Sequence, residues 1–509
     1  MNNLYQVLEN TASNYPDNVA LIFREHRIVY RDVKEATDRL AMGLKSLGLG
    51  PGDRIAIMLP NLPHFPMSIF ALLKIGVTIV PVSIFFKAEE IHHQLEDSEV
   101  KGIIFWEGFR SIVLEAVQGL ERCEKLIVLG EKSDPGEIRL TYLMETKNPI
   151  EETTEVDLDD TAFIVYTAGM TGRPRGAELT HNNILSNIQA CAEFLKFNVD
   201  DGVVGVLSLY HPIGLTLVMG SFFYVGARVL LVPKFDAEAI LKLIEAEKPT
   251  FFIGVPSMYR EFLKVEDGES VDISSLKFCL SSGDALKSET MEEFESKFNV
   301  HILEGYGLTE ASPLVSFNSP VRERKAGSIG LPLPRIELKI IDETGSEVKP
   351  GNVGEIIVQG SNVMKGYLNR PEATKEALKD GWLYTGDLAK LHDNGFASIV
   401  DRKKDVIVKS GFNVYPREVE KFLVGHPKIR EAVVVGLPDP IQGEEIHASI
   451  VLKDGEESTQ EEIIEYVKER MATYKCPSVV HFVSTLPKGP TGRVLRGKIR
   501  QSIEKDKKQ

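Results

Sequence analysis

The sequence is poor in cysteine and in basic charge. It has four cysteines in 509 residues and no Cys-x-x-Cys pair, so neither a zinc site nor a disulfide framework is indicated, and a reducing cytosol fits best. The 59 Lys and Arg residues face 74 Asp and Glu, and the net charge of −15 argues against a general nucleic-acid-binding surface. An anionic ligand must therefore be held by local basic residues.

Long apolar runs and targeting signals are missing too. The N-terminus shows no basic leader followed by an apolar stretch, so no secretory signal is visible. The longest apolar region, residues 65–86, is interrupted by Pro66, Lys74, Gly76 and Pro81, which predicts a helix, a glycine stop and a strand rather than a membrane span. We expect a cytoplasmic protein without a transmembrane segment. Peripheral membrane contact and a homodimer remain open.

The order of apolar runs predicts the fold class. A chain this long needs two or three domains. Short apolar runs separated by helix-length segments such as 64–75 predict βαβ units and a mostly parallel, doubly wound sheet. The first set of runs is 54–59, 77–80, 102–105 and 125–129, and a second, similar layer is indicated by 229–232, 250–254 and 278–281.

The pattern changes after residue 327. Short alternating runs such as 337–342 and 354–358 predict an antiparallel, barrel-like β segment. The polar stretch 401–405 then precedes a final unit of about a hundred residues, a usual domain size. We therefore expect an α/β protein with a large N-terminal domain of two doubly wound sheets plus the barrel-like segment, residues 1–401, and a small α+β C-terminal domain.

A glycine-rich loop at residues 167–176 carries the first sign of chemistry. It follows a β-branched apolar run, 162–166, that reads as a buried strand, and a helix is expected to begin after Thr180. The loop offers backbone amides, the hydroxyls of Thr167 and Thr171, and two arginines, which suits a phosphate. No Gly-Lys-Ser/Thr ends it, so it is not the usual nucleotide P-loop. In isolation a simple turn explains it equally well.

Two further polar segments each follow a predicted strand. They are residues 281–286 and 304–310, and ligands of open α/β sheets gather at the carboxyl ends of strands. Tyr306 could stack on a base, Thr309 could bond a phosphate, and Glu310 could hold Mg²⁺ through oxygen. Each segment alone is more often structural.

Six motifs in order resemble the adenylate-forming superfamily of acyl-CoA synthetases, luciferases and adenylation domains, with the nearest look to fatty-acyl-CoA ligases. The resemblance covers nearly all of the chain and rests on YTAGMTGRPRGAELTH, LYHPIG, EGYGLTE, GWLYTGDLA, DRKKDVIVKSGFNVYPREVE and LPKGPTGRVLRGKIR. It implies a two-step reaction. A carboxylate attacks the α-phosphate of ATP to give acyl-AMP and pyrophosphate, and a CoA thiol then displaces AMP.

The resemblance also implies roles for residues of the N-terminal domain. Glu310, with Thr167, would hold Mg²⁺, and Thr309 would contact the α-phosphate. His211 would lie at the mouth of the acyl pocket, although a lone histidine is more often a packed or surface residue. The β- and γ-phosphates would lie in the loop formed by Thr167, Ala168, Gly169, Met170, Thr171 and Gly172, and the adenine in a slot formed by Gly283, Glu304, Gly305 and Tyr306.

In the C-terminal part the resemblance implies a moving domain. Asp387 would accept hydrogen bonds from the ribose, with Arg402 beside it. Residues 402–404 would form a hinge centred on Lys404, followed by the mobile domain 405–509. Ser410, Gly411 and Phe412 would line the pantetheine channel in the thioester-forming pose.

The chain departs from the family's pattern at four positions. Ala168 and Met170 stand where hydroxyl residues are usual, and Arg175 replaces a lysine, so we expect weakened but not abolished ATP binding. Arg493 replaces the lysine that reaches the α-phosphate and the carboxylate. Arginine keeps the charge in a wider, planar fork, and loss of one well-placed electrostatic contact typically costs about 10²–10³ in rate.

The leading hypothesis is a ligase that converts a medium- or long-chain fatty acid to acyl-CoA with ATP, Mg²⁺ and CoA, releasing AMP and pyrophosphate. An aryl-acid–CoA ligase is the nearest alternative. Arg493 suggests a second alternative, an enzyme that favours the thioester half-reaction. A third alternative is a non-catalytic protein that binds acyl-CoA or AMP.

Overall fold

The computed structural model describes residues 3–146, 150, 152–167, 174–322, 324–410, 412–489 and 494–506. It divides into two compact units. The first comprises residues 1–338 and 358–384, and the second residues 339–357 and 385–509. Each unit is described by itself.

The first unit contains one sheet with eight strands among the described residues. The strands β4, β3, β5, β6 and β7 pair in parallel, whereas β9 pairs antiparallel with both β8 and β19. The order is β19 (Gly366–Tyr367), β9 (Arg175–Thr180), β8 (Thr161–Thr167), β4 (Thr78–Pro81), β3 (Arg54–Met58), β5 (Gly102–Trp106), β6 (Lys125–Leu129) and β7 (Glu137–Arg139). The connecting helices are α2 (Tyr30–Ser46), α3 (His64–Lys74), α4 (Ala88–Asp97), α5 (Arg110–Ala116) and α6 (Leu140–Met144).

A second sheet of this unit has nine strands in the described part of the chain. The strands predicted in the second layer correspond to β11, β12 and β13, and β1 and β2 from the N-terminus extend this sheet at one edge, because β1 pairs in parallel with β11. The order is β16 (Leu331–Pro332), β15 (Leu314–Phe317), β14 (Ile302–Gly307), β13 (Phe278–Ser281), β12 (Phe251–Gly254), β10 (Gly202–Gly205), β11 (Arg228–Leu231), β1 (Val19–Phe23) and β2 (His26–Val29). Its helices are α1 (Gln6–Asn14), α8 (Ser221–Val225), α9 (Ala237–Glu247), α10 (Pro256–Leu263) and α11 (Ser288–Phe298).

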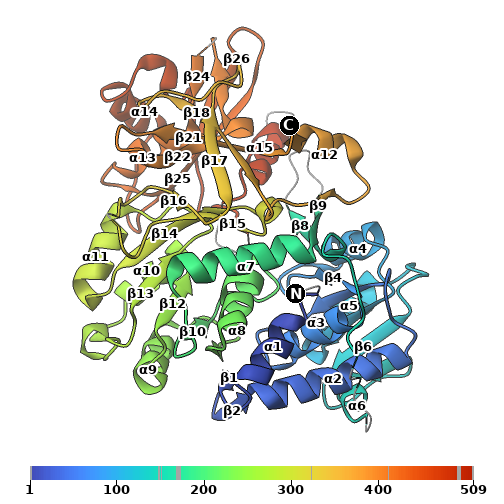
Figure 1. Ribbon diagram of the computed structural model, residues 1–509. Helices are drawn as coiled ribbons and strands as arrows, with labels where there is room; N and C mark the ends of the chain where they lie inside the picture. Colours follow the sequence, from blue (N-terminus) through green and yellow to red (C-terminus); the bar gives the residue numbers. More distant parts are fainter. Residues whose placement is uncertain are drawn as a thin grey trace. The chain divides into compact units, whose positions relative to one another are not determined.

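Helix α7 (His181–Leu195), green in Figure 1, contacts both sheets. Thr180 caps it as predicted, since its hydroxyl accepts from the Asn183 amide at 3.1 Å. From the middle of the helix, Asn187 exchanges hydrogen bonds with the backbone of Leu314 in β15, at 2.7 and 3.2 Å. The helix directly follows β9 of the eight-stranded sheet, so it fixes the ends of both sheets relative to each other.

Apolar cores explain why these elements form. One core packs Phe252, Tyr259, Phe262 and Phe294 between the nine-stranded sheet and helices α9–α11, and another packs Val80, Ile103 and Phe105 under α4 and α5. Burying a side chain of this size contributes about 1.5–3 kcal/mol. All four cysteines are free and buried. In the described ranges, none of the helices combines the length and the apolar character needed to cross a membrane.

The second unit has two β regions. One belongs to a five-stranded sheet formed by β17 (Ile336–Ile341), β18 (Val353–Gly360), β20 (Leu378–Lys379), β21 (Trp382–Leu391) and β22 (Ala397–Arg402). Strands β20 and β22 both pair antiparallel with β21. The boundary between the two units falls inside β17, β18 and β21. The other region is a sheet that comprises β23 (Ile407–Lys409), β24 (Phe412–Val414), β25 (Ile429–Asp439), β26 (Gly443–Leu452) and β27 (Val479–Phe482). The helices of this part of the chain are α13 (Pro416–Val424), α14 (Gln460–Lys468) and α15 (Arg496–Asp506). Helix α12 (Pro371–Ala377) belongs to the first unit. The α/β fold class is confirmed.

Candidate functional site

Strand pairing brings four polar side chains of the first unit together. Thr167 ends β8 and lies opposite Arg175, the first residue of β9. The short strand β19 pairs with the other edge of β9 and places Tyr367 opposite Ala177. Glu310 lies in the 3₁₀ turn η4 (Thr309–Ala311) that follows β14. We call Thr167, Arg175, Glu310 and Tyr367 the Glu310 cluster.

The cluster is centred on one carboxylate oxygen. The Tyr367 hydroxyl donates to Glu310 Oε1 at 2.8 Å, and the Thr167 hydroxyl approaches the same oxygen at 3.5 Å. The Arg175 guanidinium carbon lies 5.6 Å from the centre of the Tyr367 ring, which is cation–π range. The Glu310 backbone is also fixed, because its carbonyl accepts from the Met364 amide at 2.8 Å.

The electrostatics of the cluster keep the phenol protonated. Burial raises the pKa of Tyr367 well above its ordinary value; the neighbouring Glu310 charge and the hydrogen bond to Glu310 act in the same direction, and Arg175 acts against them. Tyr367 therefore remains a hydrogen-bond donor to Glu310 throughout the physiological pH range.

The donor set of the cluster fits a small divalent cation. A carboxylate and a hydroxyl are the hard oxygen ligands that Mg²⁺ prefers, and Glu310 and Thr167 bring these two groups together. In the parts of the chain that are described, no group of three or more His, Cys, Asp or Glu could hold a metal. Glu310 and Thr167 would thus supply two ligands, and Mg²⁺ in nucleotide sites takes others from phosphates and water.

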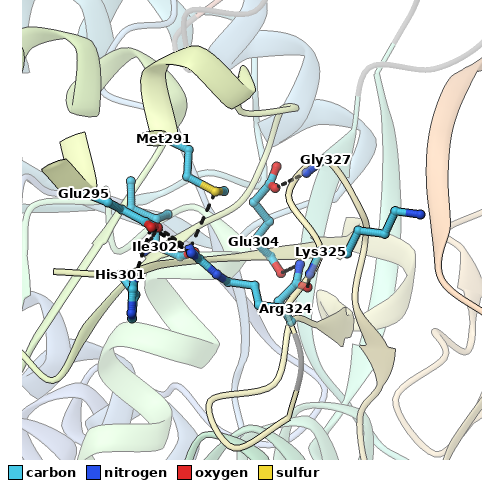
Figure 2. A network of polar contacts seen from close by, with 9 residues as sticks. Met291, Glu295, His301, Ile302, Glu304, Arg324, Lys325 and Gly327 are labelled. Carbon is cyan, nitrogen blue, oxygen red and sulfur yellow. Dashed lines mark hydrogen bonds and ion pairs between the residues drawn. The ribbon is translucent and has the colours of Figure 1, made fainter. Parts of the chain in front are cut away.

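A buried carboxylate ties together the loops around β14. Glu304 is 8% exposed, and its Oε2 accepts from the Gly327 amide at 2.7 Å while Oε1 accepts from the Leu286 amide at 3.3 Å, as Figure 2 shows for Gly327. Burial raises the pKa of Glu304, although the two amides and Arg324 oppose the shift. The carboxylate therefore holds the loop that begins at Gly283, whose φ of 90° suits glycine, against the loop at Gly327.

An arginine anchors the second of these loops. The Arg324 guanidinium forms a two-point ion pair with Glu295 of α11, one contact of which measures 2.7 Å, and donates to the Ile302 carbonyl at 2.7 Å (Figure 2). Bidentate pairs of this kind combine energy with fixed geometry. Arg324 thereby holds the Gly327 loop beside β14, which carries Glu304, Gly305 and Tyr306.

His211 lies before a buried π-helical turn, η2 (Ile213–Gly220). Its Nδ1 accepts from the Ile213 amide at 3.3 Å, so the neutral ring carries its proton on Nε2. Burial lowers the pKa of His211 to about 4. The imidazole is therefore neutral near neutral pH.

This shift predicts a pH-dependent stability. Between pH 6.5 and about 4 the unfolded chain binds a proton at residue 211 that the folded chain does not, so folding weakens as pH falls through that range. The His211→Gln variant should lose less stability than the wild type between about pH 7 and pH 5. Thermal midpoints would measure this, and His26→Gln, at an exposed site, is the control. Equal losses in wild type and His211→Gln would contradict the prediction.

Asp387, Arg402, Lys404 and Ser410 are described site candidates that belong to the second unit. Asp387 in β21 lies opposite Arg402 in β22, and the Arg402 Nε is 3.1 Å from Asp387 Oδ1. Lys404 is exposed in the turn η5 (Lys403–Asp405). Ser410 is exposed, with a φ of 51°, and its amide donates to the Gln442 carbonyl at 2.7 Å. Asp387 and Arg402 thus form an ion pair with each other, and their role at a ribose stays a prediction.

Some predicted residues lie outside the described residues. They are Ala168, Gly169, Met170, Thr171 and Gly172 of the phosphate loop, Gly411, and Arg493. Their roles stay predictions.

Sequence reasoning missed Tyr367 and Arg324. The pair Gly366-Tyr367 is too short to predict a strand, and its partner β9 lies far away in the sequence. Arg324 lies between a glutamate and a lysine in a charged stretch of the sequence, and no pattern links it to Glu295. Only the pairing of distant segments shows either role.

A family model described as AMP-binding enzyme matches residues 8–368, and a second, described as AMP-binding enzyme C-terminal domain, matches residues 418–493. The chain belongs to this family of AMP-binding enzymes. Membership implies the use of ATP or AMP and, with the relatives below, of coenzyme A, so the prediction of an AMP-forming acyl-CoA synthetase is confirmed.

Individual relatives are similar over almost their whole length. A long-chain-fatty-acid–CoA ligase of Bacillus subtilis is 36% identical and aligns over 97% of this chain and 94% of its own. A feruloyl-CoA synthase of an Amycolatopsis species is 34% identical over 93% and 94%. The crystal structure of ATP-bound MatB from Rhodopseudomonas palustris superposes with a TM-score of 0.90 at 29% identity and covers 99% of both chains.

Proposed function

We propose that this chain activates a medium- or long-chain fatty acid as acyl-AMP and then transfers the acyl group to CoA. The observation that carries the reaction type is the Glu310 cluster, which gathers a carboxylate, a hydroxyl and a guanidinium, the last two from residues that border the phosphate-loop motif in the sequence. The choice of a fatty acid rests on the long-chain-fatty-acid–CoA ligase relatives, such as the one at 36% identity.

The residues of the first unit suit the first half-reaction. A carboxylate oxygen of the acid bonds to the α-phosphorus of ATP while the bond to pyrophosphate breaks, so charge on the phosphates must be neutralised. Arg175 supplies positive charge, and Thr309 is proposed to contact the α-phosphate. Mg²⁺ held by Glu310 and Thr167 would neutralise further phosphate charge. Gly283, Gly305 and Tyr306 are proposed to form the adenine slot, whose loops Glu304 holds together.

The second half-reaction needs a different arrangement. The CoA thiolate attacks the acyl carbon and AMP leaves. We propose that residues 1–401 and 405–509 are domains joined by the hinge 402–404, with Asp387 and Arg402 at the ribose and Ser410 to Phe412 along the pantetheine path. The two family-model matches, 8–368 and 418–493, fall on either side of this hinge, which supports the division.

An aryl acid is the second candidate, because feruloyl-CoA synthases are 34% identical to this chain. Initial rates of CoA-dependent AMP release with long-chain, medium-chain and short-chain fatty acids and with ferulate separate the two. We expect kcat/KM to be highest for a medium- or long-chain fatty acid. Turnover confined to ferulate would overturn the choice of acid and leave the ligase reaction in place.

Two further properties are proposed with the function. We place the enzyme in the cytoplasm, where its substrates ATP and CoA are abundant and where four free cysteines stay reduced. A homodimer is the oligomeric state to test first, by light scattering of the purified chain.

A further inference from the structure

Tyr367 occupies a position that its surroundings fix on several sides. The Tyr367 amide donates to the Thr374 hydroxyl at 2.9 Å, and the Tyr367 carbonyl accepts from the Arg370 amide at 3.1 Å. The next residue, Leu368, donates its amide to the Gly176 carbonyl at 2.8 Å. These hydrogen bonds fix the backbone from which the Tyr367 phenol reaches Glu310.

The same turn is linked through helix α4 to strand β8, which carries Thr167. The Arg370 guanidinium contacts Asp97 Oδ1 of α4 at 2.6 Å, and the Tyr166 hydroxyl of β8 donates to Asp97 Oδ2 at 2.8 Å. Tyr166 directly precedes Thr167 of the Glu310 cluster. Asp97 therefore connects the strand that carries Thr167 to the turn that carries Tyr367.

The hydrogen bond of Tyr367 selects one oxygen of Glu310. Both the Tyr367 hydroxyl and the Thr167 hydroxyl are directed to Oε1, so Oε2 is the oxygen that neither bond uses. A hydrogen bond to one carboxylate oxygen fixes the rotation of the whole group and thus the direction of the other oxygen. Groups that orient a metal ligand in this way are as much part of a metal site as the ligand itself.

We propose that Tyr367 is a positioning residue that holds the Glu310 carboxylate ready to bind the divalent cation that accompanies ATP. Arg175 stacks on the Tyr367 ring and keeps the phenol in place. This proposal rests on the proposed function, because it takes Glu310 as the cation ligand.

The test uses the full chain and the Tyr367→Phe variant, which keeps the ring that Arg175 contacts and removes only the hydroxyl. ATP binding is titrated by calorimetry at a series of Mg²⁺ concentrations, and Mn²⁺ binding is followed by electron paramagnetic resonance. We expect Tyr367→Phe to need about 10–100-fold more Mg²⁺ or Mn²⁺ for half-maximal effect, the usual cost of losing such a partner. Tyr142→Phe, at a tyrosine that is 58% exposed, is the matched control and should behave as the wild type.

Each outcome decides one question. An unchanged cation requirement in Tyr367→Phe would overturn the positioning role while leaving the proposed ligase intact. A thermal midpoint that collapses in Tyr367→Phe would mean that the phenol serves the fold and would also overturn it. ATP binding by the wild type that ignores Mg²⁺ would overturn Glu310 as ligand and Tyr367 with it. Failure of the wild type to release AMP with any acid would refute the proposed function alone, because the binding titration would still report on Tyr367.

Discussion

The Glu310→Gln variant is expected to release AMP from ATP and acid about 10²–10³-fold more slowly than the wild type. Glutamine has the shape of glutamate and can still accept the Tyr367 hydrogen bond through its carbonyl oxygen, so the turn η4 should be preserved. What disappears is the negative charge that would hold a cation against the phosphates. Initial rates at saturating acid and ATP measure the loss.

The control for this variant is Glu292→Gln, which makes the same chemical change at an exposed position of α11. It should retain the wild-type rate. Because Mg²⁺ binding would be weakened, higher Mg²⁺ concentrations should recover part of the Glu310→Gln rate. A variant that matches the wild type at every Mg²⁺ concentration would show that Glu310 has no part in the reaction.

The Asp38→Asn variant should be less stable than the wild type by about 3–5 kcal/mol, the usual cost of breaking a buried ion pair. Lys74 is fully buried in α3, and its Nζ lies 2.7 Å from Asp38 Oδ1 in α2. The hydroxyl of the equally buried Tyr5 donates to the same oxygen at 2.5 Å. Asparagine would leave the Lys74 ammonium buried without a counter-charge. Urea unfolding measures the loss.

The pH dependence adds a second readout for this pair. Burial lowers the pKa of Lys74, and Asp38 opposes that shift, so Asp38→Asn should lower it further. At a pH between the lowered pKa of Lys74 in the folded variant and its ordinary pKa in the unfolded chain, only the unfolded chain is protonated at Lys74. The free energy of unfolding of the variant should therefore rise as pH rises through that range. Asp32→Asn, exposed on the same helix, should stay within about 0.5 kcal/mol of the wild type. A loss below about 1 kcal/mol in Asp38→Asn would contradict the buried-pair account.

The fold was predictable where local pattern decides structure. The strands predicted at 125–129 and 278–281 are observed with those bounds, and the helix predicted at 64–75 is His64–Lys74. Lys74 shows the limit of such patterns. In the sequence it interrupts an apolar region as a polar residue, yet it is buried because Asp38, on another helix, pairs with it. The addition of β1 to the nine-stranded sheet was likewise invisible, since it depends on pairing with β11.

The candidate site was predictable where a motif carries a residue type that the chemistry needs. Thr167 and Glu310 were singled out from separate motifs, and their oxygens lie 3.5 Å apart. Tyr367 was not, because a tyrosine after a glycine has no chemical signature until β19 places it beside Glu310. The paired loops around Glu304 depend in the same way on Arg324 meeting Glu295 across a long separation in sequence.

The most direct test of the proposed function is to trap the intermediate. Purified protein is mixed with ATP, Mg²⁺ and a long-chain fatty acid without CoA, quenched after a single turnover, and analysed by mass spectrometry; CoA is then added to a second sample. The account predicts that fatty acyl-AMP forms in the first sample and is converted to acyl-CoA with release of AMP in the second. Absence of acyl-AMP, despite thioester formation when CoA is present, would contradict the adenylation step and favour the alternative that Arg493 suggests.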